Sequence, residues 1–204
     1  MKSLLLVGGG GHCKACIDVI EVAKIYQIKG LVQPKRSSET VLGYPVIGSD
    51  DDLPQLVNSF KSVLITVGQI KDPAPRIRLF NLVKRLGAEL PVVYSSRAYC
   101  SKHAVVGEGS VIMHGAIINA CAQIGNNCII NSQALVEHDV KIGDHCHIST
   151  GTRVNGNVTV GSGAFIGSGV VIKEGVKVGK NVVIGAGQTV LCDVPNYMVM
   201  KNDE

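Results

Sequence analysis

A branched aliphatic residue occupies every sixth position in the C-terminal half of this chain. The series runs from Val106 to Val190 and contains fifteen Val or Ile residues, with neither insertion nor slip. A period of six fits neither an amphipathic helix, whose period is near 3.6, nor an ordinary strand, whose period is 2. Such a repeat is typical of a parallel β-helix, in which each hexad supplies one short side of a triangular coil. The sequence therefore predicts an all-β prism for this half of the chain.

Three hexads complete one coil, so residues 18 apart are expected to stack on one another. One row consists of the residues three positions after Val106 and after every eighteenth residue from it. This row contains only residues that tolerate a positive φ. Glycine and asparagine accept that conformation at least cost, and histidine is also enriched there. We therefore expect this row to be a turn in which His145 serves the backbone rather than chemistry. The row consists of Gly109, Asn127, His145, Gly163 and Asn181.

A second row is unusual because it contains a histidine between two small residues. His138 has Ala120 one coil before it and Gly156 one coil after it, which leaves open space around an imidazole. The next residue, Asp139, can accept a proton from one ring nitrogen and raise the basicity of the other. These features predict a general base, and a solvated turn histidine is the alternative.

The N-terminal half alternates apolar strand segments with helical segments. We expect strands at 3–7, 28–32, 44–47 and 63–67, and helices at 12–24, 50–58 and 75–86, with Gly87 as a C-terminal cap. This alternation predicts a small parallel sheet whose ligand crevice lies at the carboxyl ends of its strands, where Gly8–Gly11 and Gly68 occur. We expect a Rossmann-like α/β domain over residues 1–95 and the β-helix over residues 96–204.

The four glycines after the first strand favour phosphate binding. A strand, a glycine loop and a helix together bring backbone N–H groups to a phosphate. The dinucleotide fingerprint would need glycine where Cys13 stands, and an acidic residue to hold a ribose where Gln33 stands. A nicotinamide dehydrogenase is therefore disfavoured. A nucleotide phosphate is the favoured ligand, and a tight turn without a ligand is the alternative.

Composition excludes several classes of partner. The net charge is only +4 and no basic run occurs, so we expect no nucleic-acid partner. No apolar stretch approaches the ~20 residues of a membrane span, and the opening MKSLLLV is too short for a signal sequence. We expect a cytoplasmic protein with reduced thiols, in which Cys128 and Cys146 are small core residues. No Cys or His spacing resembles a zinc site, so we expect no metal.

Several motifs together resemble a known family. These are the glycine loop that closes with Gly11-His12, the stretch VIGSDDDL (46–53), the hexads from about residue 100, and VEHDVKIGDHCHIS (136–149). They resemble the left-handed β-helix acetyltransferases of the sialic acid O-acetyltransferase type. The best-known members N-acetylate nucleotide-linked amino sugars of bacterial surface-glycan biosynthesis, notably UDP-4-amino-4,6-dideoxy-N-acetylglucosamine. The resemblance implies a homotrimer that binds acetyl-CoA between neighbouring prisms.

The resemblance also implies roles for individual residues. His138 is the general base, Asp139 polarises it, and the Gly156 amide stabilises the thioester oxyanion. The implied acetyl-CoA contacts are His147, Ser168 and Ala186. The implied nucleotide-sugar contacts are Gly10, Gly11, His12 and Gly68.

The sequence departs from the family pattern in two places, one near the nucleoside of the nucleotide sugar and one near CoA. Gln33-Pro34-Lys35 stands where members usually carry acidic residues near the nucleoside, so UDP, dTDP and GDP all stay open. The tail VPNYMVMKNDE (194–204) lacks the usual G-x-P-A-like segment beside the cofactor.

The leading hypothesis is acetyl transfer from acetyl-CoA to the amine of a nucleotide-linked amino sugar. The first alternative is O-acetylation of a sialic acid. A second is a non-catalytic, nucleotide-binding trimeric scaffold. A carbonic-anhydrase-like shell would need three metal-binding histidines, and His138 and His147 lack a convincing third partner.

Overall fold

The computed structural model describes residues 1–35, 38–70 and 72–201. The chain divides into two compact units, Met1–Gly68 with Ala74–Ser96, and Gln69–Pro73 with Arg97–Glu204. The short segment Gln69–Pro73 thus belongs to the second unit, although it connects two elements of the first. Within the described part of the chain, no helix is long and apolar enough to cross a membrane.

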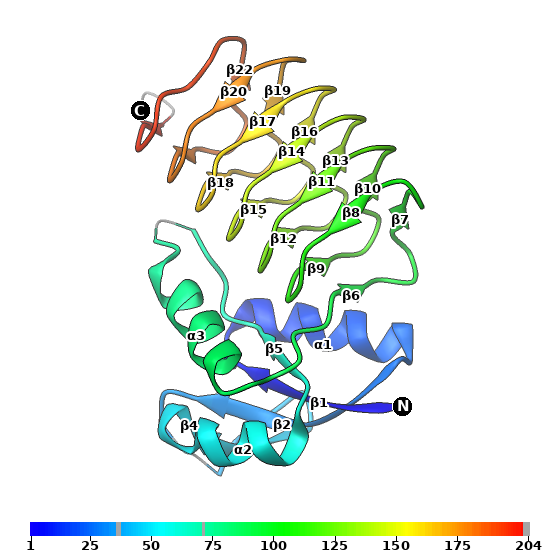
Figure 1. The fold of residues 1–204 in the computed structure, drawn as a ribbon, viewed down its shortest axis with the longest axis vertical. Coiled ribbons are helices and arrows are strands. Elements are labelled where there is room, and N and C mark those ends of the chain that lie inside the picture. The colour runs from blue at the N-terminus through cyan, green and yellow to red at the C-terminus, as the bar shows by residue number, and fades with distance from the viewer. Residues whose placement is uncertain (36–37, 71, 202–204) are drawn as a thin grey trace. The chain divides into compact units, whose positions relative to one another are not determined.

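The first unit is an α/β sheet with helices, as the alternating pattern predicts (Figure 1). Its strand order is β3-β4-β2-β1-β5, and all neighbours except β3 and β4 are parallel. Leu4, Leu5 and Leu6 of the central strand β1 are fully buried. The strands of this sheet are β1 (Lys2–Val7), β2 (Tyr26–Gln33), β3 (Thr40–Val41), β4 (Tyr44–Ser49) and β5 (Val63–Ile65), and the short strand β6 (Val93–Tyr94) lies outside it. The helices are α1 (Gly11–Ala23), η1 (Asp50–Asp52), α2 (Leu53–Phe60) and α3 (Ala74–Arg85).

The first unit differs from the sequence prediction at β3, at the start of α2 and at the end of β5, and the two-residue strand β6 was not expected either. Strand β3 was not expected, because it has two residues; it pairs with β4 across Leu42 and Gly43, which both have positive φ as a tight hairpin turn requires. The helix expected over 50–58 begins as the 3-10 turn η1, where Oδ2 of Asp52 accepts the Ser49 N–H at 2.7 Å. Strand β5 ends at Ile65, two residues earlier than expected.

The expected cap of the third helix is confirmed. Helix α3 ends at Arg85, and Gly87 follows with φ +81°. Its N–H donates to the Lys84 carbonyl at 3.0 Å, which satisfies one of the last carbonyls of the helix.

The second unit is the expected β-helix, built from strands of two residues on three faces. The β13 face comprises β7 (Tyr99–Cys100), β10 (Ile117–Ile118), β13 (Leu135–Val136), β16 (Arg153–Val154), β19 (Val171–Ile172) and β22 (Thr189–Val190). The β14 face comprises β8 (Val105–Val106), β11 (Gln123–Ile124), β14 (Lys141–Ile142), β17 (Thr159–Val160) and β20 (Lys177–Val178). The β15 face comprises β9 (Val111–Ile112), β12 (Ile129–Ile130), β15 (His147–Ile148), β18 (Phe165–Ile166), β21 (Val183–Ile184) and β23 (Val199–Met200).

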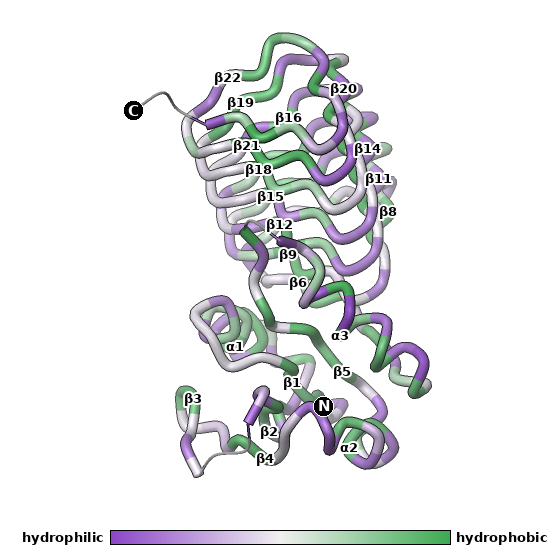
Figure 2. The backbone as a smooth tube through the Cα atoms, turned by 90° about the vertical axis from the view of Figure 1, so that its left-hand side faces the viewer, coloured by the Kyte–Doolittle hydropathy of each residue, from purple (hydrophilic) through white to green (hydrophobic). Residues whose placement is uncertain are grey.

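The register of the coils follows the predicted repeat. Strands 18 residues apart pair in parallel, as Ile118 does with Val136 and Val136 with Val154. The aliphatic series fills the interior; Ile118, Val136 and Val154 are all fully buried. Hydrophobic and hydrophilic stretches alternate along the coils in Figure 2. The aliphatic residue of each hexad is therefore the one whose side chain faces the interior of the prism.

The predicted turn row is confirmed, but it is one of three. Asn127 and His145 have φ values of 53° and 59°, and their side chains meet at 3.0 Å between Nδ2 and Nδ1. Positive φ also occurs at the same place in the other hexads, including Gln133 and Asp139. A second edge is also mostly glycine: it consists of Gly115, Gln133, Gly151, Gly169 and Gly187. The third edge uses more varied residues in the same conformation, namely Cys121, Asp139, Asn157 and Gly175.

The two inward cysteines are core residues, as expected. Cys128 and Cys146 are fully buried, and their thiols donate to the carbonyls of Gly143 and Gly161, each at 3.2 Å. The hydrogen bond with the Cys128 thiol, and then burial, raise the pKa of Cys146 well above its ordinary value. Neither thiol therefore resembles an activated nucleophile.

Candidate active site

His138 lies on the edge of the prism between the β13 and β14 faces, beside Asp139. Nδ1 of the imidazole is 2.9 Å from Oδ2 of Asp139. A carboxylate only accepts hydrogen bonds, so Nδ1 carries the proton and donates it. Nε2 is therefore the nitrogen available as a base. Both side chains are exposed, by 64% and 59%.

The surroundings of His138 raise its pKa above the ordinary value of 6.5. The largest cause is the hydrogen bond to Asp139, and the negative charges of Asp139 and Glu137 add to it. Desolvation acts in the opposite direction. The raised pKa makes the neutral imidazole a stronger base, which suits the removal of a proton from an attacking group.

Gly156 lies directly against the imidazole. A Cβ at this position would be 2.8 Å from both Cε1 and Nε2 of His138, so only glycine leaves the ring where it is. Within the described residues, the Gly156 N–H has no hydrogen-bond acceptor. A hydrogen-bond donor and a base therefore face one space. That space is a groove of about 640 Å³, lined by Glu137, His138, Asn155, Gly156, Asn157, Glu174 and Gly175.

Glu137 was not singled out from the sequence, yet it is fixed beside the base. Its Oε2 accepts hydrogen bonds from Nδ2 of Asn119 at 3.0 Å and from the His138 N–H at 3.3 Å. The available signal was the polar pair Asn119 and Glu137, which stack one coil apart. Glu137 therefore holds the backbone of His138 in place.

The glycine loop of the first unit packs tightly at its start and is open at its end. Gly8 has φ +117°, and a Cβ there would lie 2.8 Å from the Val67 backbone nitrogen. The Gln33 side-chain amide lies against Gly9. Gly10 and Gly11 have open space instead, and Gly10 is the N-cap of α1 with no side-chain hydrogen bond. The loop therefore leaves the N-terminus of α1 uncovered by side chains of the loop.

The structure brings His12 and Gly68 to this same place. A Cβ on Gly68 would be 3.4 Å from Cβ of His12, so the two backbones approach closely. Nε2 of His12 is 3.4 Å from Sγ of Cys16. Burial raises the pKa of Cys16 to about 12, so the thiol keeps its proton and can donate it to Nε2. The Gly10, Gly11, His12 and Gly68 set therefore forms one cluster at the carboxyl edge of the sheet.

His147 is buried and bonded at both ring nitrogens, unlike His138. It belongs to β15, is 7% exposed, and packs edge-on against Phe165 with ring centroids 5.2 Å apart. Nδ1 is 2.6 Å from the Gln69 carbonyl oxygen, and Nε2 is 3.1 Å from Nδ2 of Asn131. The β15 face that carries it is separate from the edge that carries His138.

Ser168 and Ala186 lie together on another edge, between the β15 and β13 faces. They occupy adjacent coils, and both are exposed. The Ser168 carbonyl accepts the Gly187 N–H at 2.8 Å, and the Ser168 hydroxyl is 3.0 Å from that of Ser149. The candidate base and these candidate cofactor contacts therefore occupy two different edges of one prism.

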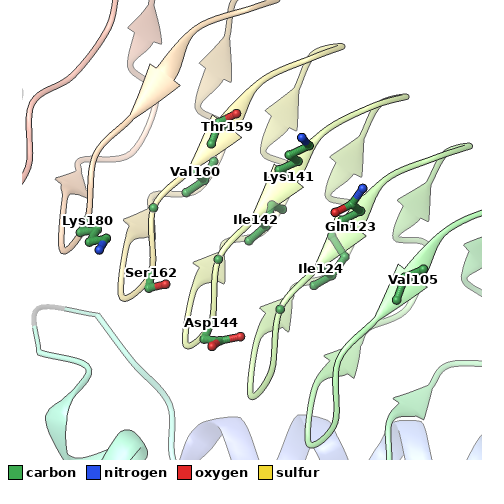
Figure 3. A pocket seen from close by; sticks show the side chains of 13 residues that line it. Val105, Gln123, Ile124, Lys141, Ile142, Asp144, Thr159, Val160, Ser162 and Lys180 are labelled. Atoms are coloured by element: carbon green, nitrogen blue, oxygen red, sulfur yellow. The ribbon is translucent and has the colours of Figure 1, made fainter.

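A second groove, of about 500 Å³, covers the β14 face (Figure 3). Gln123, Lys141 and Thr159 stand along its strands, and Asp144, Ser162 and Lys180 lie on the turns that follow. None of the candidate site residues lines this groove. Among the described residues, no group of three or more His, Cys, Asp or Glu side chains is arranged to hold a metal ion.

Both halves match known protein families. A family model described as the PglD N-terminal domain matches residues 3–82. The model for the bacterial transferase hexapeptide matches residues 103–138, 122–156 and 157–187. No curated protein matches the chain by sequence.

Solved structures match nearly the whole chain. The acetyltransferase domain of PglB from Neisseria gonorrhoeae is 29% identical, with a TM-score of 0.89 over 98% of this chain and 96% of that one. A mutant of perosamine N-acetyltransferase from Caulobacter crescentus, in complex with CoA and GDP-perosamine, is 31% identical, with a TM-score of 0.90 over 98% and 93%. WeeI from Acinetobacter baumannii is 25% identical, with a TM-score of 0.87 over 99% and 98%.

These matches agree with the geometry of the two units. A PglD-type α/β domain is followed by hexapeptide coils, and the relatives include structures with acetyl-CoA or CoA bound. The chain belongs to the left-handed β-helix sugar N-acetyltransferases and is an acetyl-CoA-dependent N-acetyltransferase.

Proposed function

We propose that the acceptor is the amine of a nucleotide-linked amino sugar of bacterial surface-glycan biosynthesis, with UDP-4-amino-4,6-dideoxy-N-acetylglucosamine as the first candidate. The observation that carries the proposal is the His138–Asp139 pair, which faces the Gly156 N–H in one groove. One relative was solved with GDP-perosamine, so its nucleotide sugar is a second candidate for this chain.

The chemistry is direct transfer between the two substrates. The amine nitrogen attacks the thioester carbonyl while Nε2 of His138 takes the proton that the amine loses. The Gly156 N–H stabilises the tetrahedral oxyanion, and one such donor is typically worth ~3 kcal/mol. Collapse breaks the carbon–sulfur bond, and His138 returns its proton to the departing thiolate of CoA.

The first unit is proposed to hold the nucleotide part of the substrate. The N-terminus of α1 carries unsatisfied N–H groups and a partial positive charge, which suit a diphosphate. Gly10 and Gly11 leave that end uncovered, and His12 and Gly68 lie beside it. The Gln33 amide occupies the space against Gly9, so we propose ribose or base contacts that differ from those of an acidic residue.

The positions of the candidate residues support a homotrimer. His138 and Ser168 lie on the two edges that border the β13 face. A threefold arrangement with this face toward the axis places the His138 edge of one protomer beside the Ser168 edge of the next. Acetyl-CoA in that cleft would then contact both sets at once. On this face Tyr99 and Ile117 are exposed hydrophobic residues.

A binding screen followed by a rate assay tests the proposed function. Thermal-shift measurements with UDP, dTDP and GDP identify the nucleotide, and thiol release from acetyl-CoA is then measured with the matching 4-amino sugar and with a sialic acid. We expect thiol release with the amino sugar alone. Release with the sialic acid alone would instead favour O-acetylation, and no release with any acceptor would favour a scaffold.

A further inference from the structure

Among the described residues, Arg76 is the largest side chain that the fold buries completely. It belongs to α3, which packs against β5 (Figure 1). Its Nη1 donates hydrogen bonds to the carbonyl oxygen of Ile65 at 2.6 Å and to that of Val67 at 2.8 Å. A guanidinium keeps its charge in proteins, and burying a charge is costly even when hydrogen bonds compensate for it. That cost indicates a role for Arg76 beyond filling the core.

The two hydrogen bonds satisfy the outer edge of β5. This strand is the last one of its sheet, so only one of its edges pairs with β1. The Thr66 N–H faces β1 and donates to the Val7 carbonyl at 2.8 Å. Successive residues of a strand direct their backbone groups to opposite edges, so the carbonyls of Ile65 and Val67 face away from β1. Arg76 therefore bonds two carbonyls that a further strand would otherwise have to satisfy.

The segment that Arg76 holds is part of the cluster at the carboxyl edge of the sheet. Oγ1 of Thr66 donates to the Gly8 carbonyl at 2.8 Å, and a Cβ on Gly8 would be 2.8 Å from the Val67 nitrogen. Gly68 follows directly and lies against Cβ of His12. All of these residues belong, with α3, to the first unit. The guanidinium therefore fixes the backbone that leads into Gly68.

The charge of Arg76 also reaches the first turns of α1. Burial raises the pKa of the Cys16 thiol to about 12, and the positive charge of Arg76 opposes that rise. Sγ of Cys16 is in turn 3.4 Å from Nε2 of His12. Charges inside a protein are screened much less than charges on its surface. An anion at the N-terminus of α1 is therefore attracted by this guanidinium as well as by the helix.

We propose that Arg76 is a positioning residue for the nucleotide-sugar site, which strengthens binding of the diphosphate without touching it. Its hydrogen bonds hold the backbone before Gly68, and its charge favours an anion at the N-terminus of α1. Because the side chain is fully buried, it does not itself contact a ligand. The effect on substrate binding rests on the proposed function, whereas the anchoring of the end of β5 does not.

Two replacements of Arg76 test the proposal by calorimetry with UDP, dTDP and GDP, each compared with its monophosphate. Arg76→Met removes the charge and both hydrogen bonds, while Arg76→Lys keeps the charge and loses the planar fork of donors. For the diphosphate that the wild type binds best, Arg76→Met is expected to raise Kd about five- to thirtyfold. Arg76→Lys is expected to raise it about two- to fourfold.

The comparison with the monophosphate separates the charge from the anchor. In Arg76→Met the loss should be larger for the diphosphate, because that ligand carries more negative charge. In Arg76→Lys, which keeps the charge, the two losses should be equal. In steady-state assays with the matching amino sugar, both variants should raise KM for the sugar. KM for acetyl-CoA should stay within about twofold, because the proposed cofactor contacts lie on the β-helix.

Arg78→Met is the matched control for net charge. Arg78 lies on the same helix, its side chain is 64% exposed, and it pairs with Asp50 at 3.4 Å. The replacement removes one positive charge from the surface and should leave Kd for the diphosphate within about twofold of the wild type. An equal loss in Arg78→Met and Arg76→Met would overturn the inference, because net charge alone would then explain it.

Hydrogen exchange tests the anchor without any nucleotide. A peptide spanning residues 62–69 should exchange faster in Arg76→Met than in the wild type, with Arg76→Lys between them. If Arg76→Met does not fold, the exchange and the Kd of Arg76→Lys decide. Unchanged exchange, or unchanged diphosphate affinity in the folded variants, would overturn the inference. A wild type that binds none of the three diphosphates, or transfers no acetyl group to any sugar, would instead contradict the proposed function.

Discussion

Asp139 meets two requirements that few residues satisfy together. Its φ is +60°, a conformation that aspartate and asparagine tolerate better than most residues with a side chain. In this conformation its carboxylate reaches Nδ1 of the preceding His138 at 2.9 Å. The position thus serves the turn of the coil and the basicity of the imidazole together. Asparagine at this position would preserve the positive φ of the turn but would remove the negative charge that makes the imidazole more basic.

Asp139→Asn is expected to move the pH dependence of the reaction toward acid. The carboxylate raises the pKa of His138 above 6.5, so its removal lowers that pKa. His138 acts as a base only when neutral, at pH values above its pKa, and the acidic limb of the kcat/KM profile should therefore shift to lower pH. The measurement is a pH–rate profile combined with NMR titration of His138. A limb that shifts to higher pH would contradict the assigned pair.

Gly156→Ala should lower the rate of acetyl transfer because it displaces His138. The added methyl group would lie 2.8 Å from Cε1 and Nε2 of His138 and must displace the ring. His138→Ala removes the base and is expected to reduce kcat/KM by about 10²- to 10⁴-fold. If both changes act on one constellation, the double variant should be little worse than His138→Ala alone. Fully additive losses would show that the two residues act independently.

At the scale of elements, the sequence predicts regular segments well and irregular ones poorly. The β-helix follows from the aliphatic series because every hexad repeats one environment, and four strands and three helices of the first unit follow from apolar periodicity. Strand β3 has only two residues, which is too short for a period. Cys121 and Gln133 occupy turn positions of the other two edges, and their left-handed conformation comes from the coil rather than from their own preference.

The candidate site is predictable to the extent that it is local. His138, Asp139 and Gly156 are adjacent or one coil apart, so the stacking rule alone places them together. The hydrogen bond between His147 and Gln69 joins residues 78 positions apart, and no period in the sequence connects them. The surroundings of His147 therefore depend on tertiary structure that the sequence pattern does not contain.

The glycine loop gives a prediction at this scale. Gly8→Ala should destabilise the first unit by about 1–3 kcal/mol, because its Cβ would overlap the Val67 backbone. Gly10→Ala should leave the unfolding temperature nearly unchanged, because open space surrounds that position and its φ is −78°. Gly10→Ala should nevertheless weaken nucleotide binding, since the methyl group covers the N-terminus of α1. Unchanged nucleotide affinity, measured by calorimetry, would place the phosphate elsewhere.

At the scale of the whole molecule, the two-edge arrangement predicts complementation between inactive subunits. His138→Ala removes the proposed base. Ala186→Arg should block acetyl-CoA from the edge that carries Ala186 and Ser168. If each site combines one edge from each of two protomers, unfolding and refolding the two variants together should recover about a quarter of the wild-type activity by random assembly. Each variant refolded alone provides the control. No recovery in mixed trimers would mean that one protomer holds the complete site.

The coils also determine which changes in chain length the protein can accept. Each coil contacts only its neighbours, so a whole coil of 18 residues can be added or removed near the C-terminal end as a separate module. Six residues preserve the aliphatic period but rotate everything that follows by one edge. Inserted between His138 and Gly156, they would leave a well-packed prism whose base and amide lie on different edges. Insertions of six residues therefore preserve the packing of the core, whereas only insertions of 18 residues also keep the base and the amide on the same edge.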